Sequence, residues 1–151
     1  MNKKLNELFK EKQYKVYSIN ENSSLKEAVR ILVENHIGSL MVLDDQGEIQ
    51  GIFTERDVII KLAHTDQKVS QLPVKEVMTS KDKLIIGHDD DKIDYLMQIM
   101  TTHKIRHLPI MKRDGSLMGI LSIRDIIRVL LRDTKQKVKF LNDYISGKYP
   151  S

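Results

Sequence analysis

The spacing of apolar residues divides the first half of the chain into alternating short strands and helices. Strict alternation predicts strands, and apolar residues three or four positions apart predict amphipathic helices. In order, the pattern predicts a strand at 14–19, a helix at 24–35, strands at 39–43 and 48–53, and a helix at 54–62. Ser24, with Glu27 three residues later, forms a capping box for the first of these helices. Gly47, in the turn between the two central strands, can adopt a positive φ.

The second half repeats this order. The pattern predicts a strand at 83–86, a helix with Ile93, Leu96, Met97 and Met100 on its inner face, strands at 105–111 and 117–121, and a helix from Ser122 to about Leu131. We expect Asp89-Asp90-Asp91 to cap the first of these helices. The polar segment 63–76 should connect the halves, and Val77-Met78-Thr79 opens the second. A short amphipathic helix is predicted near residues 2–12.

Two seven-residue segments show that the chain is an internal duplication. Gly51–Asp57 and Gly119–Asp125 both read Gly, two apolar residues, a hydroxyl residue, any residue, Arg, Asp, and they lie 68 positions apart (119 − 51 = 68). Residues 37–57 align with 105–125 without a gap. The positions that recur include glycines at both turns, so backbone geometry is repeated as well as hydrophobicity. They are Ile37, Leu40, Gly47, Gly51, Ile52, Arg56 and Asp57.

The chemistry of each heptad has two interpretations. Thr54 fits the N-cap of the following helix and Asp57 the acidic third position of a capping box, and Ser122 and Asp125 repeat the arrangement. Capping does not explain the arginines at 56 and 124, because a cation at a helix N-terminus opposes the helix dipole. Such an arginine could instead face an anion held at the helix start. Both interpretations remain open from these residues alone.

Composition restricts the function classes. Apolar residues make up 40% of the chain and charged residues 30%, which is typical of a soluble globular protein. The absence of cysteine excludes disulfides, thiolate metal sites and cysteine nucleophiles. No apolar run approaches the roughly 20 residues that cross a bilayer, and the N-terminus lacks the apolar core of a secretion signal. We therefore expect a cytoplasmic protein.

The sequence gives little support to an enzyme. His103 and His107 are four residues apart, but the predicted strand at 105–111 prevents them from sharing a helix face, and the glutamate of a zinc-binding helix motif is missing. The chain has no glycine-rich phosphate loop and no nucleophile-elbow motif. We expect solvated roles for His36, His64 and His88. We therefore expect no catalytic residues and no metal ligands.

The net charge of +4 suits anionic small molecules better than nucleic acid, which usually requires a clustered basic stripe. The segment 132–151 predicts a helical tail that lies across the domain or a partner subunit. Its lysines at 135, 137 and 139 are assigned to one side, and Val138, Leu141, Tyr144 and Ile145 to the other. A membrane-surface or nucleic-acid arm is the alternative interpretation.

These features together resemble the cystathionine-β-synthase (CBS) domain family, as a tandem pair that forms one Bateman module. The resemblance rests on the paired heptads, on Ile105–Ile110 and on Val77-Met78-Thr79, and it covers roughly 16–131. It implies an α/β (α+β) fold of two β-α-β-β-α repeats with short terminal helices. The implied boundaries are an N-terminal helix at 1–13, repeat 1 at 14–62, a connector at 63–76, repeat 2 at 77–131 and a tail at 132–151.

The resemblance also implies regulatory binding of an adenosine-containing ligand: AMP, ADP, ATP, an NAD-type dinucleotide or S-adenosylmethionine, with no other cofactor required. In such a site Asp57 or Asp125 would bind the ribose hydroxyls, and Thr54 or Ser122 would contact ribose or phosphate. Arg56 or Arg124 would face phosphate with its planar set of donors.

Adenine would lie in an apolar slot between strands. The resemblance assigns to the slot of repeat 2 Thr79, Lys81, Arg106, His107, Leu108 and Pro109, and to that of repeat 1 Tyr17, Ser18, Ile37, Gly38 and Met41. Repeat 2 should be the better phosphate site, because repeat 1 has Gly38 and Ser39 in place of its Arg and His. Gly38 would let a larger group, such as a dinucleotide, approach the backbone.

The expected function is a nucleotide sensor that acts through a homodimer or through a protein partner not identified by the sequence. One alternative is a ligand-free oligomerisation adaptor. A further alternative is a nucleic-acid or membrane-surface binder that uses the basic helix, whose arginines 124, 128 and 132 share one face at spacing four. A solvated basic face explains those arginines equally well, so neither nucleic acid nor membrane is an expected partner.

Overall fold

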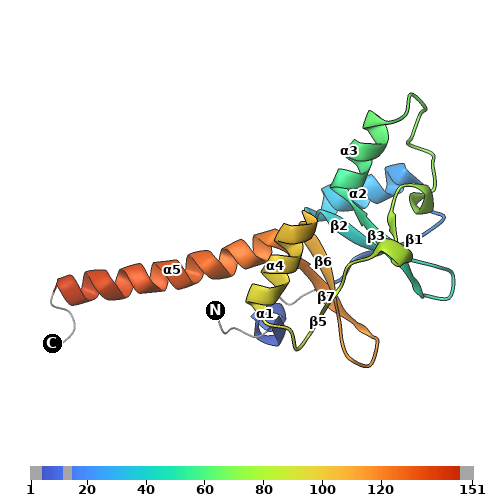
Figure 1. Cartoon of the computed structure of the whole chain (residues 1–151). Coiled ribbons are helices and arrows are strands. Elements are labelled where there is room, and N and C mark those ends of the chain that lie inside the picture. The colour runs from blue at the N-terminus through green and yellow to red at the C-terminus, as the bar shows by residue number, and fades with distance from the viewer. Residues whose placement is uncertain (1–4, 12–14, 147–151) are drawn as a thin grey trace.

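The computed structural model describes residues 5–11 and 15–146, without the side chains of Asn6, Glu7, Glu11 and Tyr144. The described residues form a mixed α/β structure (Figure 1). The first half contains α1 (Leu5–Glu11), β1 (Ser18–Asn20), α2 (Leu25–Asn35), β2 (Ser39–Leu43), β3 (Ile49–Thr54) and α3 (Glu55–Ala63). The second contains the 3₁₀ turns η1 (Val74–Glu76) and η2 (Lys81–Lys83), and β4 (Thr79–Ser80), β5 (Gly87–His88), α4 (Ile93–His103), β6 (His107–Met111), β7 (Leu117–Ser122) and α5 (Ile123–Ile145).

The strands form two sheets, and one sheet combines both halves of the chain. The first has the order β1-β2-β3-β4 and the second β5-β6-β7. The pair β1–β2 is parallel, whereas β2–β3 and β3–β4 are antiparallel. Strand β4 belongs to the second half, and it pairs Ser80 with Gly51 and Thr79 with Ile52. The opening segment of the second half is therefore attached to the last strand of the first.

Backbone conformations repeat along with the sequence. His36 and Lys104, which end α2 and α4, have φ values of 54° and 56°, and Gly47 and Gly115, in the two hairpins, have φ values of 81° and 91°. Both pairs are separated by 68 residues, the offset of the two heptads. This confirms the duplication at the level of the backbone.

Each sheet has its own apolar core, the second of which also contains Leu5, Leu8 and Phe9 of α1, and a third cluster joins the two sheets. Leu32, Leu40 and Phe53 lie in the first core, and Leu96, Leu108 and Leu121 in the second. Met41 and Ile52 from the first sheet pack with Ile120 from β7, and all three are buried. Burial of apolar surface stabilises proteins by roughly 25 cal/mol per Å². This cluster therefore stabilises the arrangement of the two halves as well as each sheet.

Several predicted elements differ from the structure. Both early strands were predicted a few residues too close to the N-terminus, because β1 begins at Ser18 and β5 at Gly87. The expected cap on α4 is wrong, since the N-cap is Lys92 and its side chain forms no capping bond. Instead, Asp91 accepts a hydrogen bond from the backbone N–H of His88, and Asp90 pairs with Arg113 at 3.0 Å.

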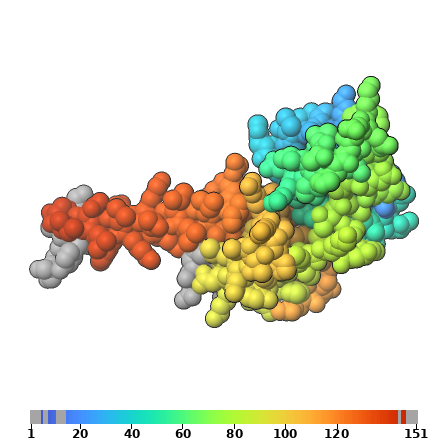
Figure 2. All heavy atoms as spheres, turned by 45° about the horizontal axis from the view of Figure 1, so that its top comes forward, coloured from blue at the N-terminus to red at the C-terminus, as the bar shows by residue number. Residues whose placement is uncertain are grey.

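The C-terminal helix also differs from its prediction. Residues 123–145 form one continuous helix, α5, whose C-terminal part projects away from the rest of the molecule (Figures 1 and 2). Of the two expected positions of the tail, the one across its own domain is wrong and the one across a partner subunit stays a prediction; residues 147–151 fall outside the described residues. In a regular helix Lys135 and Lys139 share a face, whereas Lys137 lies on the opposite one. The expected grouping of the three lysines is therefore wrong as well.

Among the described residues, no helix has both the length and the apolar character needed to span a membrane.

We predict that Gly51→Ala destabilises the protein by about 3 kcal/mol, a typical cost of overpacking a dense interior. A Cβ at this position would lie 2.2 Å from the backbone carbonyl oxygen of Thr79, so β3 and β4 could not keep their separation. Chemical denaturation measures the loss. Ser80→Ala, on the strand opposite, is the control and should change stability by much less. Equal stabilities for Gly51→Ala and the parent would contradict the role given to this close approach.

Candidate functional site

A cleft of about 1370 Å³ lies where the two halves meet. Its walls come from the corner between α2 and β2, the corner before β6, the start of α3 and the first turns of α5. The polar and charged residues that line it are Lys15, Tyr17, Asn35, His36, Ser39, Glu55, Arg106, His107, Ser122, Arg124, Asp125, Arg128 and Arg132. Its apolar side includes Val29, Ile37, Val58 and Ile120. The cleft therefore combines an apolar surface with a predominantly cationic one.

The cleft brings together residues that the sequence assigned to different sites. From the group predicted for repeat 1 it contains Tyr17, Ile37 and Gly38. From the group predicted for repeat 2 it contains Arg106, His107, Ser122, Arg124 and Asp125. This cleft therefore brings together residues from both predicted groups.

The other predicted residues do not line this cleft. Met41 and Leu108 are fully buried in apolar clusters, and Pro109 is buried within β6. The remaining ones are Ser18, Thr54, Arg56, Asp57, Thr79 and Lys81. Since Met41, Leu108 and Pro109 are inaccessible from the cleft, they can shape it only through packing.

The start of α5 positions the second heptad at the cleft. The backbone N–H of Ser122 donates to Oδ2 of Asp125 at 3.0 Å, and the N–H of Asp125 donates to Oγ of Ser122 at 3.2 Å. The N–H of Ile123 donates to the carbonyl oxygen of Arg106 at 2.9 Å. These three backbone donors are therefore already used. An anion in the cleft would depend chiefly on side chains, of which Arg124 and Arg106 are exposed.

His107 lies at the contact between the halves. A Cβ added to Gly38 would lie 2.9 Å from its ring atoms Cε1 and Nε2, so only glycine leaves room for the imidazole in this position. Burial lowers the pKa of His107 below its ordinary value of 6.5, the charge of Glu55 opposes this effect, and the charge of Arg106 adds to it. His107 is therefore neutral at physiological pH and can either donate or accept a hydrogen bond.

The first heptad has a different environment. The backbone N–H of Thr54 donates to Oδ2 of Asp57 at 2.9 Å, and the side chain of Thr79 also hydrogen-bonds to Asp57. Burial raises the pKa of Asp57, and the bonds from Thr54 and Thr79 partly offset this. The sequence grouped Thr79 with Asp125, but the structure places it beside Asp57, because β4 pairs with β3.

The two heptads therefore follow one rule. Thr79, which opens the second half, lies at Asp57, and Tyr17, which opens the first half, lines the cleft that contains Asp125. Each heptad thus faces the opening segment of the opposite repeat. Alignment of the repeats could not reveal this exchange, because it compares each repeat with the other and gives no information on which segments meet.

Sequence reasoning did not assign Lys15, Arg128 or Arg132 to the cleft. A sequence pattern could have placed Arg128 and Arg132 there, because they follow Arg124 at intervals of four residues and so share one face of α5 with it. Lys15 had none, since its position depends on how the chain enters β1. Within the part of the chain that the structure describes, no group of three His, Asp or Glu side chains could hold a metal ion.

Comparison with known proteins identifies the family. The model of the CBS domain matches residues 12–64 and 74–132. The fold is thus that of a tandem-repeat α/β module with its cleft between the repeats. The chain belongs to the CBS domain family, as a tandem pair.

Three relatives illustrate the similarity. The chain is 32% identical over 130 residues to the mitochondrial CBS domain-containing protein CBSX3 of Arabidopsis thaliana, a match that covers 85% of this chain and 63% of that protein. A CBS-domain protein from Agrobacterium tumefaciens is 32% identical with a TM-score of 0.78, covering 85% of this chain and 93% of that one. One from Pyrobaculum aerophilum, solved as a complex with AMP, is 25% identical with a TM-score of 0.70, covering 82% and 89%.

We predict that His107→Gln removes part of the acid sensitivity of the fold. Because the pKa of His107 is lowered in the folded state, the unfolded chain binds the proton first as the pH falls through 6.5. The parent should therefore lose stability relative to the variant below that pH, and the difference should stay constant above it. Urea denaturation between pH 5 and 8 measures this.

The control for this prediction is His103→Gln, at an exposed position at the end of α4. It should keep the pH dependence of the parent. A stability difference between the parent and His107→Gln that stays constant throughout the pH range would contradict the assignment to His107.

Proposed function

We propose that the cleft binds an adenosine-containing ligand with at least one phosphate, and that the chain is a regulatory sensor and not an enzyme. The observation that carries this proposal is that Asp125, an apolar surface and several cationic side chains line one cleft built from both halves. The AMP complex of the relative from Pyrobaculum aerophilum supports the choice of ligand class.

In this proposal each part of the ligand has a partner. The carboxylate of Asp125 accepts hydrogen bonds from the ribose hydroxyls, and carboxylate acceptors form strong, charge-assisted bonds. Arg124 and Arg106 bind phosphate, for which the planar guanidinium group is well suited. Adenine packs on the apolar side, near Ile37 and Val58.

The proposed regulatory effect follows from the shared cleft. A ligand that contacts both halves favours the arrangement in which both sets of contacts form, and it shifts the population only by its difference in affinity between the two arrangements. We propose that this arrangement determines how the chain contacts a second copy in a homodimer or a partner protein. Exposed apolar residues on α3 that do not line the cleft offer a surface for such contacts: Ile60 is 48% exposed and Leu62 55%.

We predict that Asp125→Asn lowers the affinity for AMP by at least about tenfold, because a hydrogen bond to a charged group contributes roughly 1.5–3 kcal/mol. Asparagine keeps an oxygen that can accept the bond from Ser122, so the start of α5 should remain folded. Isothermal titration calorimetry measures the affinity. Asp57→Asn makes the same change in the first heptad and should alter the affinity for AMP little. Parent-like affinity in Asp125→Asn would overturn the site.

The phosphate contact has its own test. Arg124→Ala should lower the affinity for AMP by about tenfold and the affinity for adenosine much less, because adenosine lacks the anion that a charge-assisted bond requires. Arg56→Ala is the matched control in the first heptad. Equal losses for AMP and adenosine would contradict a phosphate role for Arg124.

A ligand screen distinguishes the sensor from a ligand-free adaptor. A ligand at about 100 times its dissociation constant adds about 2.7 kcal/mol to stability. A thermal-shift panel should therefore include AMP, ADP, ATP, NAD, NADH and S-adenosylmethionine. No shift with any of them, and no nucleotide released from the denatured protein in mass spectrometry, would favour the adaptor.

A further inference from the structure

The C-terminal part of α5 exposes most of its side chains. Ile126 and Val129, near its start, are each 1% exposed, whereas every side chain from Thr134 to Asn142 is exposed. A single helical segment of this length is marginally stable in water, because helices in proteins depend on packing of an apolar face. The projecting part therefore requires a partner that covers such a face.

The exposed apolar residues follow a heptad pattern. The positions Ile127, Leu131, Thr134, Val138, Leu141 and Ile145 are spaced alternately by four and three residues. The five apolar members are between 48% and 81% exposed. A seam with this average spacing of 3.5 residues is the pattern of a left-handed coiled coil. Ile127 continues it onto the part of α5 that packs against the body.

Thr134, the one polar residue of the seam, is compatible with this arrangement. Its Oγ1 donates to the carbonyl oxygen of Leu130 at 2.9 Å. Its hydroxyl donor is therefore satisfied within the helix, so the side chain could be covered without losing that bond.

We propose that a second copy of this chain covers the seam, in a parallel two-stranded coiled coil formed by residues 127–145. Residues that flank the seam indicate the occupant and its direction. A parallel pair places Lys137 near the partner's Asn142, and Leu130 near the partner's Lys135, so no like charges meet. An antiparallel pair in full overlap brings Lys135 and Lys137 close to the same residues of the partner.

Two other occupants fit less well. A membrane-surface helix has a broad apolar face and a cationic polar face, but this seam is narrow, and Lys135 and Lys137 lie on different sides of the helix. Arg124, Arg128, Arg132, Lys135 and Lys139 do share one basic face, but nucleic acid bound to that face would leave the apolar seam beside it uncovered. The proposed coiled coil overlaps the nucleotide cleft only in its first turns, where Arg128 and Arg132 line the cleft, and Leu141 lies nine residues beyond Arg132 (141 − 132 = 9).

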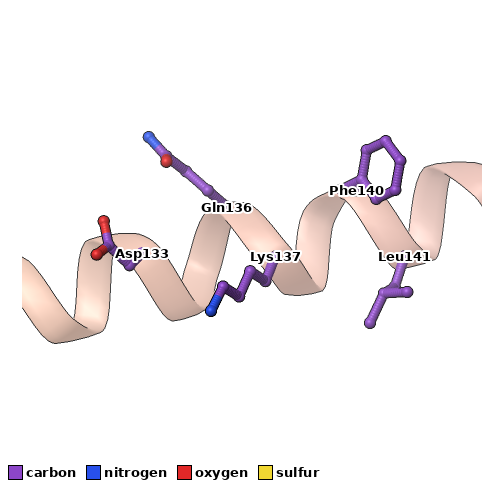
Figure 3. A pocket seen from close by; sticks show the side chains of 5 residues that line it. All are labelled: Asp133, Gln136, Lys137, Phe140 and Leu141. Carbon is purple, nitrogen blue, oxygen red and sulfur yellow. The ribbon is translucent and has the colours of Figure 1, made fainter. Parts of the chain in front are cut away.

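Neighbouring residues provide a matched pair of variants. Leu141 and Phe140 are 56% and 57% exposed, but only Leu141 belongs to the seam. Figure 3 shows the two side chains pointing to different sides of the helix, beside the shallow hollow of about 510 Å³ that they form with Asp133, Gln136 and Lys137. A change at Leu141 therefore tests the seam, and the same change at Phe140 tests only the loss of an exposed apolar group.

Sedimentation equilibrium of the full chain tests the proposal. The parent should form a dimer, Leu141→Glu should raise its dissociation constant by at least about tenfold (about 1.4 kcal/mol), and Phe140→Glu should change it by less than about twofold. Equal effects of the two variants would overturn the seam. So would a parent that remains monomeric at all concentrations, whether or not it binds vesicles containing phosphatidylserine. AMP affinity should be unchanged in Leu141→Glu, so this test and that of the nucleotide site can fail separately.

Single cysteines test the direction, since the natural chain contains none. Ile145→Cys should form a disulfide-linked dimer under mild oxidation, because the same seam position meets itself in a parallel pair. In an equal mixture of Ile145→Cys and Ile127→Cys chains, links should join like chains. A predominance of links between unlike chains would show an antiparallel pair and overturn the proposed direction.

Discussion

The pairing of β4 with β3 is the contact on which the rest of the structure depends. It requires close approach of two backbones at Gly51 and Thr79, and it attaches the beginning of the second repeat to the end of the first. The same pairing brings Thr79 to Asp57 in the first heptad. Asp125 lines the cleft between the halves and is 1% exposed, whereas Asp57 is partly exposed, so the two heptads have different environments although their backbones match.

Most of the fold could be predicted from the sequence. The helix at 25–35, both hairpins and the caps at Thr54 and Ser122 depend on local signals, such as helical spacing, turn glycines and hydroxyl residues at N-caps. The errors occurred where contacts between residues far apart in the sequence determine the local structure. The run before Gly87 has the composition of a strand, yet only Gly87 and His88 pair with β6. Continuity of α5 past residue 131 was missed because duplication suggested a helix as short as α3.

The candidate site could be predicted only as a set of residue types. Arg106, Arg124 and Asp125 could be chosen because the heptads and the strand before the second hairpin have a recognisable pattern, and all three line the cleft. Their grouping with Tyr17, Ile37 and Gly38 could not be predicted, because it depends on how the two sheets pack at Met41, Ile52 and Ile120. No local sequence pattern predicts that packing.

The exchange of segments between the repeats has an evolutionary consequence. Two separate copies of a single repeat, associated in the same way, would build two identical sites, and any mutation would change both. Fusion into one chain removes this constraint, because each position of one repeat can change while its counterpart stays the same. Gly38, which makes room for His107, and Arg106, its counterpart in the second repeat, record such a divergence. The two junctions could thus acquire different side chains while the backbone stayed the same.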